Sequence, residues 1–186
     1  MQNGKDGTQM KATGIVRRID ELGRVVIPKE IRRTQRIHSG DALEIFTDGK
    51  GEVVFKKYSP LAELGEPAAA YADVLARRLG CGVAVCDREK IVAAAGAGRS
   101  ELLGEPLPPE LDALLARRKL YTAPEEPLHR VALGSRWLLC AAPVLVHGDI
   151  EGGVLLPGMR RDAVPDPETI RAAATAAEFL ARWMGE

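Results

Sequence analysis

The chain has 186 residues, 46% of them hydrophobic, and its 26 Lys/Arg are balanced by 26 Asp/Glu. This length suffices for one ordinary domain plus a small one, and no run of about 18–20 apolar residues predicts a membrane-spanning helix. Residues 10–60 carry 11 Lys/Arg against 7 Asp/Glu, a net charge of +4, whereas residues 61–186 carry 14 against 18, a net charge of −4.

Such charge asymmetry is typical of a nucleic-acid-binding part joined to an acidic part. Residues 1–9 are polar and lack the apolar core of a signal peptide, so we expect a disordered leader, a tag remnant or an upstream start before Met10. The location expected from this pattern is the cytoplasm.

The cysteines are odd in number and lie in apolar, strand-like runs, at Cys81, Cys86 and Cys140. This usage suits a reducing compartment in which free cysteine is a small buried hydrophobe, with redox sensing as the alternative. The histidines are scattered, and no CxxC or HxxxH spacing predicts a metal site. We therefore expect neither a metal nor a cofactor.

The first predicted elements form a hairpin. Residues 12–19 favour a strand, Gly23 allows the positive φ of a tight turn, and residues 24–27 resume a strand. Pro28 removes a backbone donor and ends this strand, and a short helix follows over 29–36. The hairpin cannot bury both of its faces alone, so it requires a partner.

A second hairpin is predicted by strands over 42–47 and 52–58, joined by a connection that begins with Asp48-Gly49. Apolar and polar residues alternate along these strands, which gives each strand one face for burial. About 50 residues with so few large apolar side chains make a poor core by themselves.

The next helix starts at Ser59-Pro60, with serine as N-cap and proline at the first position. Its apolar residues recur at the spacing of a coiled-coil seam, namely Leu61, Leu64, Ala68, Tyr71 and Leu75. A proline inside a helix costs about 3 kcal/mol, so we expect a break or hinge near Glu66-Pro67. The last helix, over 167–184, has the same spacing. The two helices either cover their own sheet or pack between chains.

Between these helices, the pattern predicts a hairpin over 82–87 and 91–94, a helix over 111–120, and a mainly antiparallel sheet. The remaining strands of that sheet are expected at 128–133, 137–146 and 150–156. Ser100 and Ser135 have no nucleophile-elbow or triad context, so no catalytic residue and no enzyme are predicted.

The segment from Lys11 to Arg33, KATGIVRRIDELGRVVIPKEIRR, resembles the AbrB-type DNA-binding domain, the swapped-hairpin barrel of bacterial transition-state regulators. The resemblance continues through ALEIF at 42–46 and VVFKKY at 53–58. From Ser59-Pro60 to the Ala-rich last helix it is looser. There the whole-length pattern is similar to the SpoVT family of sporulation regulators, which join an AbrB-type head to a GAF-type domain.

This resemblance implies an α+β protein with several parts. Residues 10–58 would be an AbrB-type swapped-hairpin β-barrel, an obligate dimer. Residues 59–67 would start a linker or hinge helix. Residues 68–186 would form a GAF-like antiparallel sheet with flanking helices, serving as sensor and oligomerisation domain. GAF domains commonly hold a small ligand, and the segments most able to line such a pocket are 96–99 and 122–128, although no effector-binding residue is assigned.

The resemblance also implies which side chains contact double-stranded DNA: Arg17, Arg24, Arg32 and Arg33, with Arg18 and Lys11 as auxiliary backbone contacts. Arginine suits this task because its planar fork makes bidentate hydrogen bonds to phosphates and guanine edges. The alternative is that these are solvated charges paired with Asp20, Glu21 or Glu30. AbrB-like proteins are thought to sense DNA shape and flexibility, which is indirect readout.

The expected function is that of a sequence-flexible, DNA-binding transcription regulator of sporulation genes. It would be nucleoid-associated, and located in the forespore by resemblance. The head would form a homodimer and the C-terminal domain would join two dimers into a homotetramer that bridges or bends DNA. An unknown small effector would shift the angle of the heads through Glu66-Pro67, so Pro67→Ala would change the coupling between effector and DNA.

Two other functions are compatible with the sequence. An antitoxin-like interaction protein would use the same swapped barrel to bind a protein partner, but antitoxins usually carry a disordered acidic tail. Residues 61–186 are instead rich in helix and strand patterns. A sensor whose head only dimerises is the third hypothesis, and the intact arginines argue against it.

Overall fold

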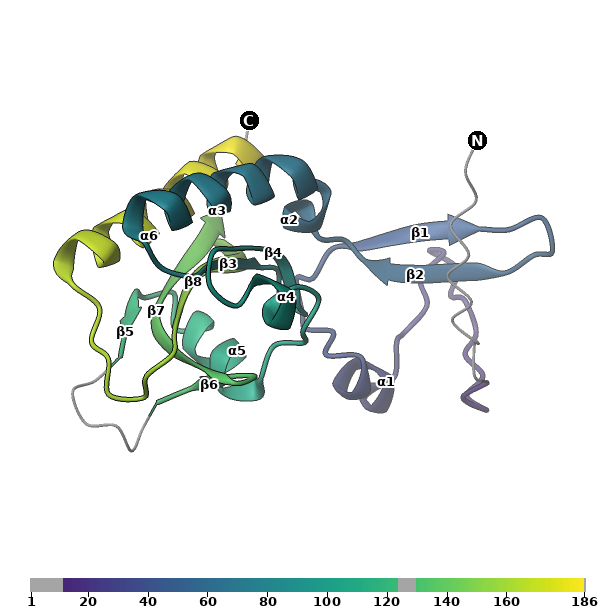
Figure 1. Cartoon of the computed structure of the whole chain (residues 1–186). Helices are drawn as coiled ribbons and strands as arrows, with labels where there is room; N and C mark the ends of the chain where they lie inside the picture. The colour runs from purple at the N-terminus through teal and green to yellow at the C-terminus, as the bar shows by residue number, and fades with distance from the viewer. Residues whose placement is uncertain (1–11, 124–129, 186) are drawn as a thin grey trace. The chain divides into compact units, whose positions relative to one another are not determined.

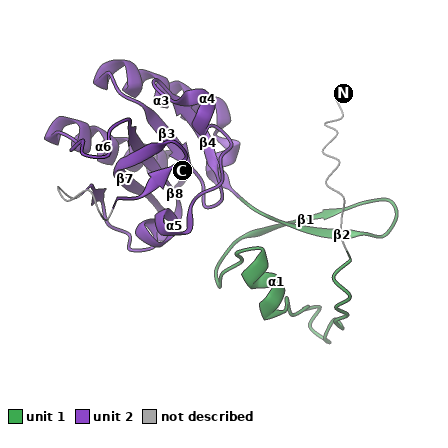
Figure 2. Cartoon of the chain, turned by 60° about the horizontal axis from the view of Figure 1, so that its bottom comes forward, with its two compact units in different colours: residues 1–58 green, residues 59–186 purple. Residues whose placement is uncertain are grey.

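The computed structural model describes residues 12–123 and 130–185, and the chain divides into two compact units (Figure 1; Figure 2). Unit 1 comprises residues 1–58 and unit 2 comprises residues 59–186. The predicted leader, Lys11 and most of the candidate pocket segment 122–128 lie outside the described residues. In the described part of the chain, no helix is long and apolar enough to cross a membrane.

Unit 1 contains a short helix and a two-stranded antiparallel sheet. Helix α1 spans Lys29–Thr34, and strand β1 (Leu43–Thr47) pairs with β2 (Val53–Lys57). Asp48 closes the hairpin between the strands, because its Oδ1 accepts hydrogen bonds from the backbone N–H groups of Lys50 at 3.0 Å and Glu52 at 2.7 Å. The hairpin predicted from Asp48-Gly49 is therefore confirmed.

The strands predicted over 12–19 and 24–27 do not form in this chain. These segments meet no ladder partner among the described residues, and the described part of unit 1 contains no closed barrel. Alternating apolar residues indicate that one face of a segment is suited to burial. A strand also needs a neighbouring strand to form hydrogen bonds with its N–H and C=O groups. Helix α1 ends before the predicted 36 because Arg36 has φ 51°, outside the helical region.

Unit 2 is an antiparallel sheet between two layers of helices, which confirms the predicted α+β class for this part of the chain. The strands are β3 (Val83–Cys86), β4 (Ile91–Ala95), β5 (Tyr121–Thr122), β6 (Ala132–Leu133), β7 (Arg136–Val146) and β8 (Asp149–Gly158). Their order is β4-β3-β8-β7-β5, with β6 paired to β7. The long β7 and β8 are joined at His147 and Gly148, both of which have positive φ, as a two-residue hairpin requires.

The helices of unit 2 are α2 (Pro60–Glu63), α3 (Gly65–Leu79), α4 (Arg99–Leu102), α5 (Pro109–Leu115) and α6 (Pro167–Gly185). Ser59 caps α2 as predicted, since its side chain accepts from the N–H of Ala62. The helix break lies at Leu64 rather than near Glu66. Pro67 falls in the first turn of α3, where backbone N–H groups have no intrahelical partner, so the proline does not interrupt the helix.

Each face of the sheet is covered by its own helices (Figure 1). Helices α3 and α6 pack on one face around Val83, Val85 and Leu156, and α4 and α5 cover the other face around Ala84 and Leu155. The two long helices thus cover their own sheet, and their packing between chains stays a prediction. Helix α5 is shorter than the predicted 111–120, and Arg118 beyond it has φ 55°.

The cysteines lie in unit 2 and are free thiols. Cys86 and Cys140 are buried, and Cys81 is half-buried. Burial raises the pKa of Cys140 to about 12 and also raises the pKa values of Cys81 and Cys86. These thiols are thus protonated at neutral pH, as expected of small buried hydrophobes.

Candidate nucleic-acid interface

A tight turn at Asp20–Gly23 organises the arginine-rich segment of unit 1. The N–H of Gly23 donates to the carbonyl of Asp20 at 2.9 Å, and the N–H of Asp20 donates to the carbonyl of Arg24 at 3.0 Å. The Asp20 carboxylate accepts from the N–H groups of Leu22 at 3.0 Å and Arg24 at 2.8 Å. Gly23 has φ 77°, which confirms the glycine turn predicted here.

Arg24 is held at the end of this turn by the same carboxylate. Its Nε lies 2.8 Å from Oδ2 of Asp20, while its side chain stays 70% exposed. The hydrogen bond from the Arg24 backbone, followed by the one from its guanidinium, lowers the pKa of Asp20 below its usual value. The sequence suggested Asp20 as a residue of the turn and as an alternative ion-pair partner, and in the structure its carboxylate also bonds to the backbone of the turn that carries Arg24.

The other predicted arginines are exposed and form no ion pair within residues 12–123 and 130–185. They are Arg17, Arg18, Arg32 and Arg33. Arg17 and Arg18 precede the Asp20 turn, and Nη1 of Arg17 donates to the Val16 carbonyl at 3.3 Å. Arg32 and Arg33 lie in the last turn of α1, where positive charge is favoured by the helix dipole.

The arginines therefore stand in two groups, around the Asp20 turn and on α1. Among the described residues of unit 1, no hydrogen bond or ion pair links residues 17–24 to α1. Each group offers unneutralised guanidinium groups to solvent, which is the chemistry that binds phosphate. Lys11, the auxiliary contact, falls outside the described residues.

The β1–β2 hairpin supplies basic side chains that the sequence did not single out. The Lys56 ammonium lies 4.8 Å from the centroid of the Phe46 ring, and Nζ of Lys57 donates to the Arg36 carbonyl at 2.6 Å. Phe46 pairs with Val54, and Lys56 lies two residues after Val54, so Phe46 and Lys56 are diagonal neighbours on one face of the hairpin. The sequence could have indicated this contact only through the predicted strand register.

Unit 1 also exposes many large apolar side chains. They include Val16 (83% exposed), Ile19, Leu22, Val26, Ile45, Val53 and Phe55. Apolar side chains at this density leave a surface that water solvates poorly, and such a patch marks an interaction face.

The candidate effector segments of unit 2 are only partly described. Residues 96–99 form a turn into α4, and a Cβ at Gly98 would lie 2.0 Å from Nε of Arg136, so this glycine leaves room for a buried arginine. Leu107, Leu111 and Leu155 fill the sheet face beside α5. Effector binding therefore stays a prediction.

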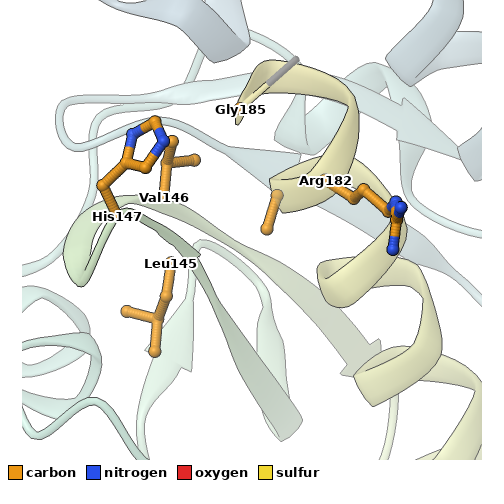
Figure 3. A pocket seen from close by; sticks show the side chains of 6 residues that line it. Leu145, Val146, His147, Arg182 and Gly185 are labelled. Atoms are coloured by element: carbon orange, nitrogen blue, oxygen red, sulfur yellow. The ribbon is translucent and has the colours of Figure 1, made fainter.

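A hollow of about 300 Å³ lies between the β7–β8 hairpin and the end of α6 (Figure 3). Leu145, Val146 and His147 line one side, and Arg182 and Gly185 line the other, with the Arg182 side chain pointing away from His147. Among the described residues, no group of three or more His, Cys, Asp or Glu is placed to hold a metal ion.

Comparison with known proteins gives two family matches. Residues 63–185 match the model described as Stage V sporulation protein T C-terminal, transcription factor, and residues 16–62 match Antidote-toxin recognition MazE, bacterial antitoxin. Stage V sporulation protein T of Bacillus subtilis (strain 168) is 42% identical over 186 residues, covering 94% of this chain and 99% of that protein.

The head has its own relatives. The transition state regulatory protein AbrB of the same organism is 61% identical over 51 residues, covering 27% of this chain and 52% of that protein. The solution structure of the N-domain of the transcription factor abrB covers 27% of this chain and 96% of its own, with 61% identity and a TM-score of 0.25. The cofactor-binding GAF domain of the nutrient sensor CodY from Clostridium difficile covers 61% and 81% of the two chains, with 13% identity and a TM-score of 0.43.

Proposed function

The chain belongs to the stage V sporulation protein T family, and from this premise we propose that it is a DNA-binding transcription regulator of sporulation genes. Unit 1 would contact double-stranded DNA through Arg17, Arg24, Arg32 and Arg33, supported by Arg18 and Lys11. By the same membership, we expect it to act on the nucleoid of the forespore.

The observation that carries this proposal is the set of exposed arginines on a unit that is 61% identical to AbrB over 51 residues. A solved structure of that domain of AbrB is described as its DNA recognition domain. Four of the predicted arginines have no acidic partner in the described part of the chain, so DNA phosphates would supply their counter-charge.

The proposal is tested by fluorescence anisotropy of a mixed promoter-DNA pool at two salt concentrations. Eight phosphate contacts in a dimer imply a slope of log affinity against log salt near −7, from about −0.9 per contact. The double variant Arg24→Ala/Arg32→Ala removes four of them, so the slope should become shallower by about 3.6. Some arginines would contact bases, which makes both numbers upper limits.

A matched control removes two exposed arginines from unit 2. Arg77 and Arg160 are each paired with an aspartate, at 2.9 Å and 2.5 Å, so Arg77→Ala/Arg160→Ala makes the same change in net charge away from the arginine groups. The control should keep the wild-type slope. Equal binding by the wild type and Arg24→Ala/Arg32→Ala, or binding by neither, would refute the assignment.

Unit 1 would act as a dimer. Its exposed apolar side chains and its strand-like segments, which have no ladder partner among residues 12–123 and 130–185, both support a second chain as the missing partner. A swapped arrangement would bury these side chains and pair the segments 12–19 and 24–27. The dimer would also carry two copies of each of the four arginines.

Unit 2 would join two such dimers into a tetramer through α3 and α6. Tyr71 stacks on Phe179 with ring centroids 4.8 Å apart, and Phe179 meets Trp183 edge-on at 5.3 Å. Phe179 and Trp183 remain 40% and 50% exposed, and Val74, three residues after Tyr71 in α3, is 55% exposed. A second copy of this helix pair would bury these side chains, and a tetramer could then bridge two DNA segments. A small effector would act in unit 2.

An antitoxin-like function is the second candidate, because residues 16–62 match an antitoxin family model. In that case the exposed apolar side chains of unit 1 would also contact a protein partner. The folded unit 2, with helices on both faces of its sheet, favours the regulator instead. The salt titration separates the two functions, because toxin recognition predicts no salt-sensitive DNA binding.

A further inference from the structure

Arg136 is a buried arginine of unit 2 that the proposed DNA contacts do not use. It lies at the start of β7, and its side chain is 7% exposed. A guanidinium has N–H donors on each of its nitrogens, and its burial is unfavourable unless they are engaged. Nε is engaged, because it lies 3.3 Å from Oε2 of Glu101. Within residues 12–123 and 130–185, Nη1 and Nη2 form no hydrogen bond or ion pair.

The backbone of the turn before α4 lies directly against this guanidinium. A Cβ at Gly98 would lie 2.0 Å from Nε and 2.5 Å from Cζ of Arg136, and Gly98 has φ 90°, a conformation that favours glycine. The Arg136 side chain is therefore held by packing against the turn and by the bond to Glu101 in α4. A group fixed in this way loses little conformational freedom when a ligand binds.

Glu101 leaves one edge of the guanidinium available. Its Oε2 also accepts from Oγ of Ser135 at 2.7 Å. This hydrogen bond and then the charge of Arg136 lower the pKa of Glu101, so the carboxylate is charged at neutral pH. Because Glu101 occupies Nε, the edge formed by Nη1 and Nη2 is the one left for a second anion. Two parallel N–H donors match two oxygens of a carboxylate or a phosphate.

We propose that Arg136 binds the anionic group of a small effector of unit 2 through Nη1 and Nη2. The group is a carboxylate or a phosphate, and two of its oxygens accept one hydrogen bond from each nitrogen. Glu101 is a positioning residue that holds Nε. A side chain that is 7% exposed is reached by a small anion more readily than by the backbone of duplex DNA. That the ligand regulates DNA binding rests on the proposed function, whereas the binding itself does not.

The test titrates the ¹⁵N-labelled full chain with sodium acetate and, separately, with inorganic phosphate, at an ionic strength held constant with chloride. The readouts are the Nε–H resonance of Arg136 and the backbone amide resonances of Gly98 and Glu101. At least one anion should give saturable shifts at these positions. Saturation by acetate alone identifies a carboxylate ligand, and saturation by phosphate alone identifies a phosphate ligand.

Two variants should change the dissociation constant in opposite directions. Arg136→Lys keeps the charge and removes the paired donors, so the constant should rise about tenfold, which corresponds to one hydrogen bond to a charged group. Glu101→Gln removes a neighbouring negative charge that is 52% exposed, so the constant should fall about threefold.

Matched controls make the same chemical changes on other helices of unit 2. Arg77→Lys alters an exposed arginine of α3 that is paired with Asp73, and Glu168→Gln alters an exposed acid in the first turn of α6. Both should keep the wild-type dissociation constant. A change in the controls equal to that in Arg136→Lys and Glu101→Gln would show a general charge effect and overturn the proposal.

Saturation by neither anion, or wild-type constants in both Arg136→Lys and Glu101→Gln, would also overturn it and leave the Arg136–Glu101 pair with a structural role. If Arg136→Lys does not fold, as judged by thermal unfolding, Glu101→Gln decides. Saturable shifts confined to Arg17 and Arg24 of unit 1 would likewise refute a site in unit 2. The anisotropy titration with promoter DNA contains neither anion, so its failure would refute the DNA contacts and leave the Arg136 site standing.

Discussion

The two units of this chain bury apolar surface to very different extents. In the described part of unit 1, Pro28 is the only buried residue, while Val16, Val26 and Ile45 are exposed. In unit 2, leucine, valine and alanine side chains fill two clusters, one on each face of the sheet. Unit 2 therefore has a core of its own, whereas the apolar side chains of unit 1 are not buried by any described residue of the chain.

The difference lies in where each unit finds its partners. The sheet of unit 2 pairs β3, β7 and β8 within one chain, and helices from the same chain cover both faces. Unit 1 has the same alternating pattern, but its segments 12–19 and 24–27 pair with nothing described. The alternation of apolar and polar residues indicates which side chains are suited to burial. It does not indicate whether the same chain or a second chain buries them.

The largest expected effect is loss of the proposed unit 1 dimer in Ile45→Asp. Ile45 lies opposite Phe55 in the β1–β2 ladder and is exposed in the single chain. If a second chain covers this pair, a buried carboxylate costs at least about 3 kcal/mol in each chain, or about 6 kcal/mol in a dimer. Sedimentation velocity should then show loss of one association step, and DNA binding should be lost with it.

Glu44→Gln is the control for this variant, because Glu44 is exposed on the neighbouring position of the same strand. It should keep the wild-type assembly. Normal assembly and normal DNA affinity in Ile45→Asp would mean that unit 1 needs no second chain, and the contrast between the units would then fail.

The next effect concerns the core that unit 2 builds for itself. Leu111 of α5 is fully buried, so Leu111→Ala leaves a cavity and should lower the free energy of unfolding by about 3 kcal/mol. For a unit of this size the melting temperature should fall by about 10 °C. Leu103→Ala, at a position 49% exposed, should change it little. Equal melting temperatures for the two variants would contradict the described core.

The sequence predicted unit 2 well because its signals are local. The Ser59 cap, the β7–β8 hairpin and the long last helix all depend on neighbouring residues, and all are present. The helix break was misplaced by two residues, because the cost of a proline depends on its position in the helix. Pro67 lies in a first turn that needs no N–H at that position.

Unit 1 and the candidate interface were less predictable. The arginines and the glycine turn could be identified from the residues and their family resemblance. The role of Asp20 depends on a carboxylate that bonds to residues two and four positions later, and many aspartates at that spacing make no such turn. The ion pair of Arg136 and Glu101 in unit 2 joins residues 35 apart in the chain, so no local pattern indicates it.

A smaller effect on assembly is expected at the apolar side chains that remain exposed on α6 of unit 2. Trp183→Asp places a charge beside Phe179 on the exposed side of α6, where burial of each side chain by a second copy would contribute about 2 kcal/mol. Sedimentation velocity should show dimers in place of the proposed tetramers, with the proposed DNA binding by unit 1 retained. Glu178→Gln, an exposed change on the same helix, is the control. Tetramers in Trp183→Asp would place the interface elsewhere.

The smallest expected effect is a pH dependence of the stability of the Asp20 turn. The hydrogen bonds of this turn all lie within residues 20–24 of unit 1. The pKa of Asp20 is lowered first by the hydrogen bond from the Arg24 backbone and then by the one from its guanidinium. Because the pKa is lower in the folded turn, the stabilisation is complete above the usual value of 3.8 and is lost as the pH falls through the folded pKa. The turn should thus be unaffected by pH near neutrality.

A carboxyl ¹³C NMR titration of Asp20 should therefore give a midpoint below 3.8. Arg24→Ala keeps a backbone N–H at position 24 and removes only the guanidinium, so the midpoint should rise without reaching the usual value. If the Asp20 midpoint instead rises all the way to 3.8 in Arg24→Ala, the ion pair with the guanidinium holds the turn. In that case DNA phosphates that draw Arg24 away from Asp20 would also loosen the turn that presents it, whereas a partial return means that the turn persists when Arg24 is engaged.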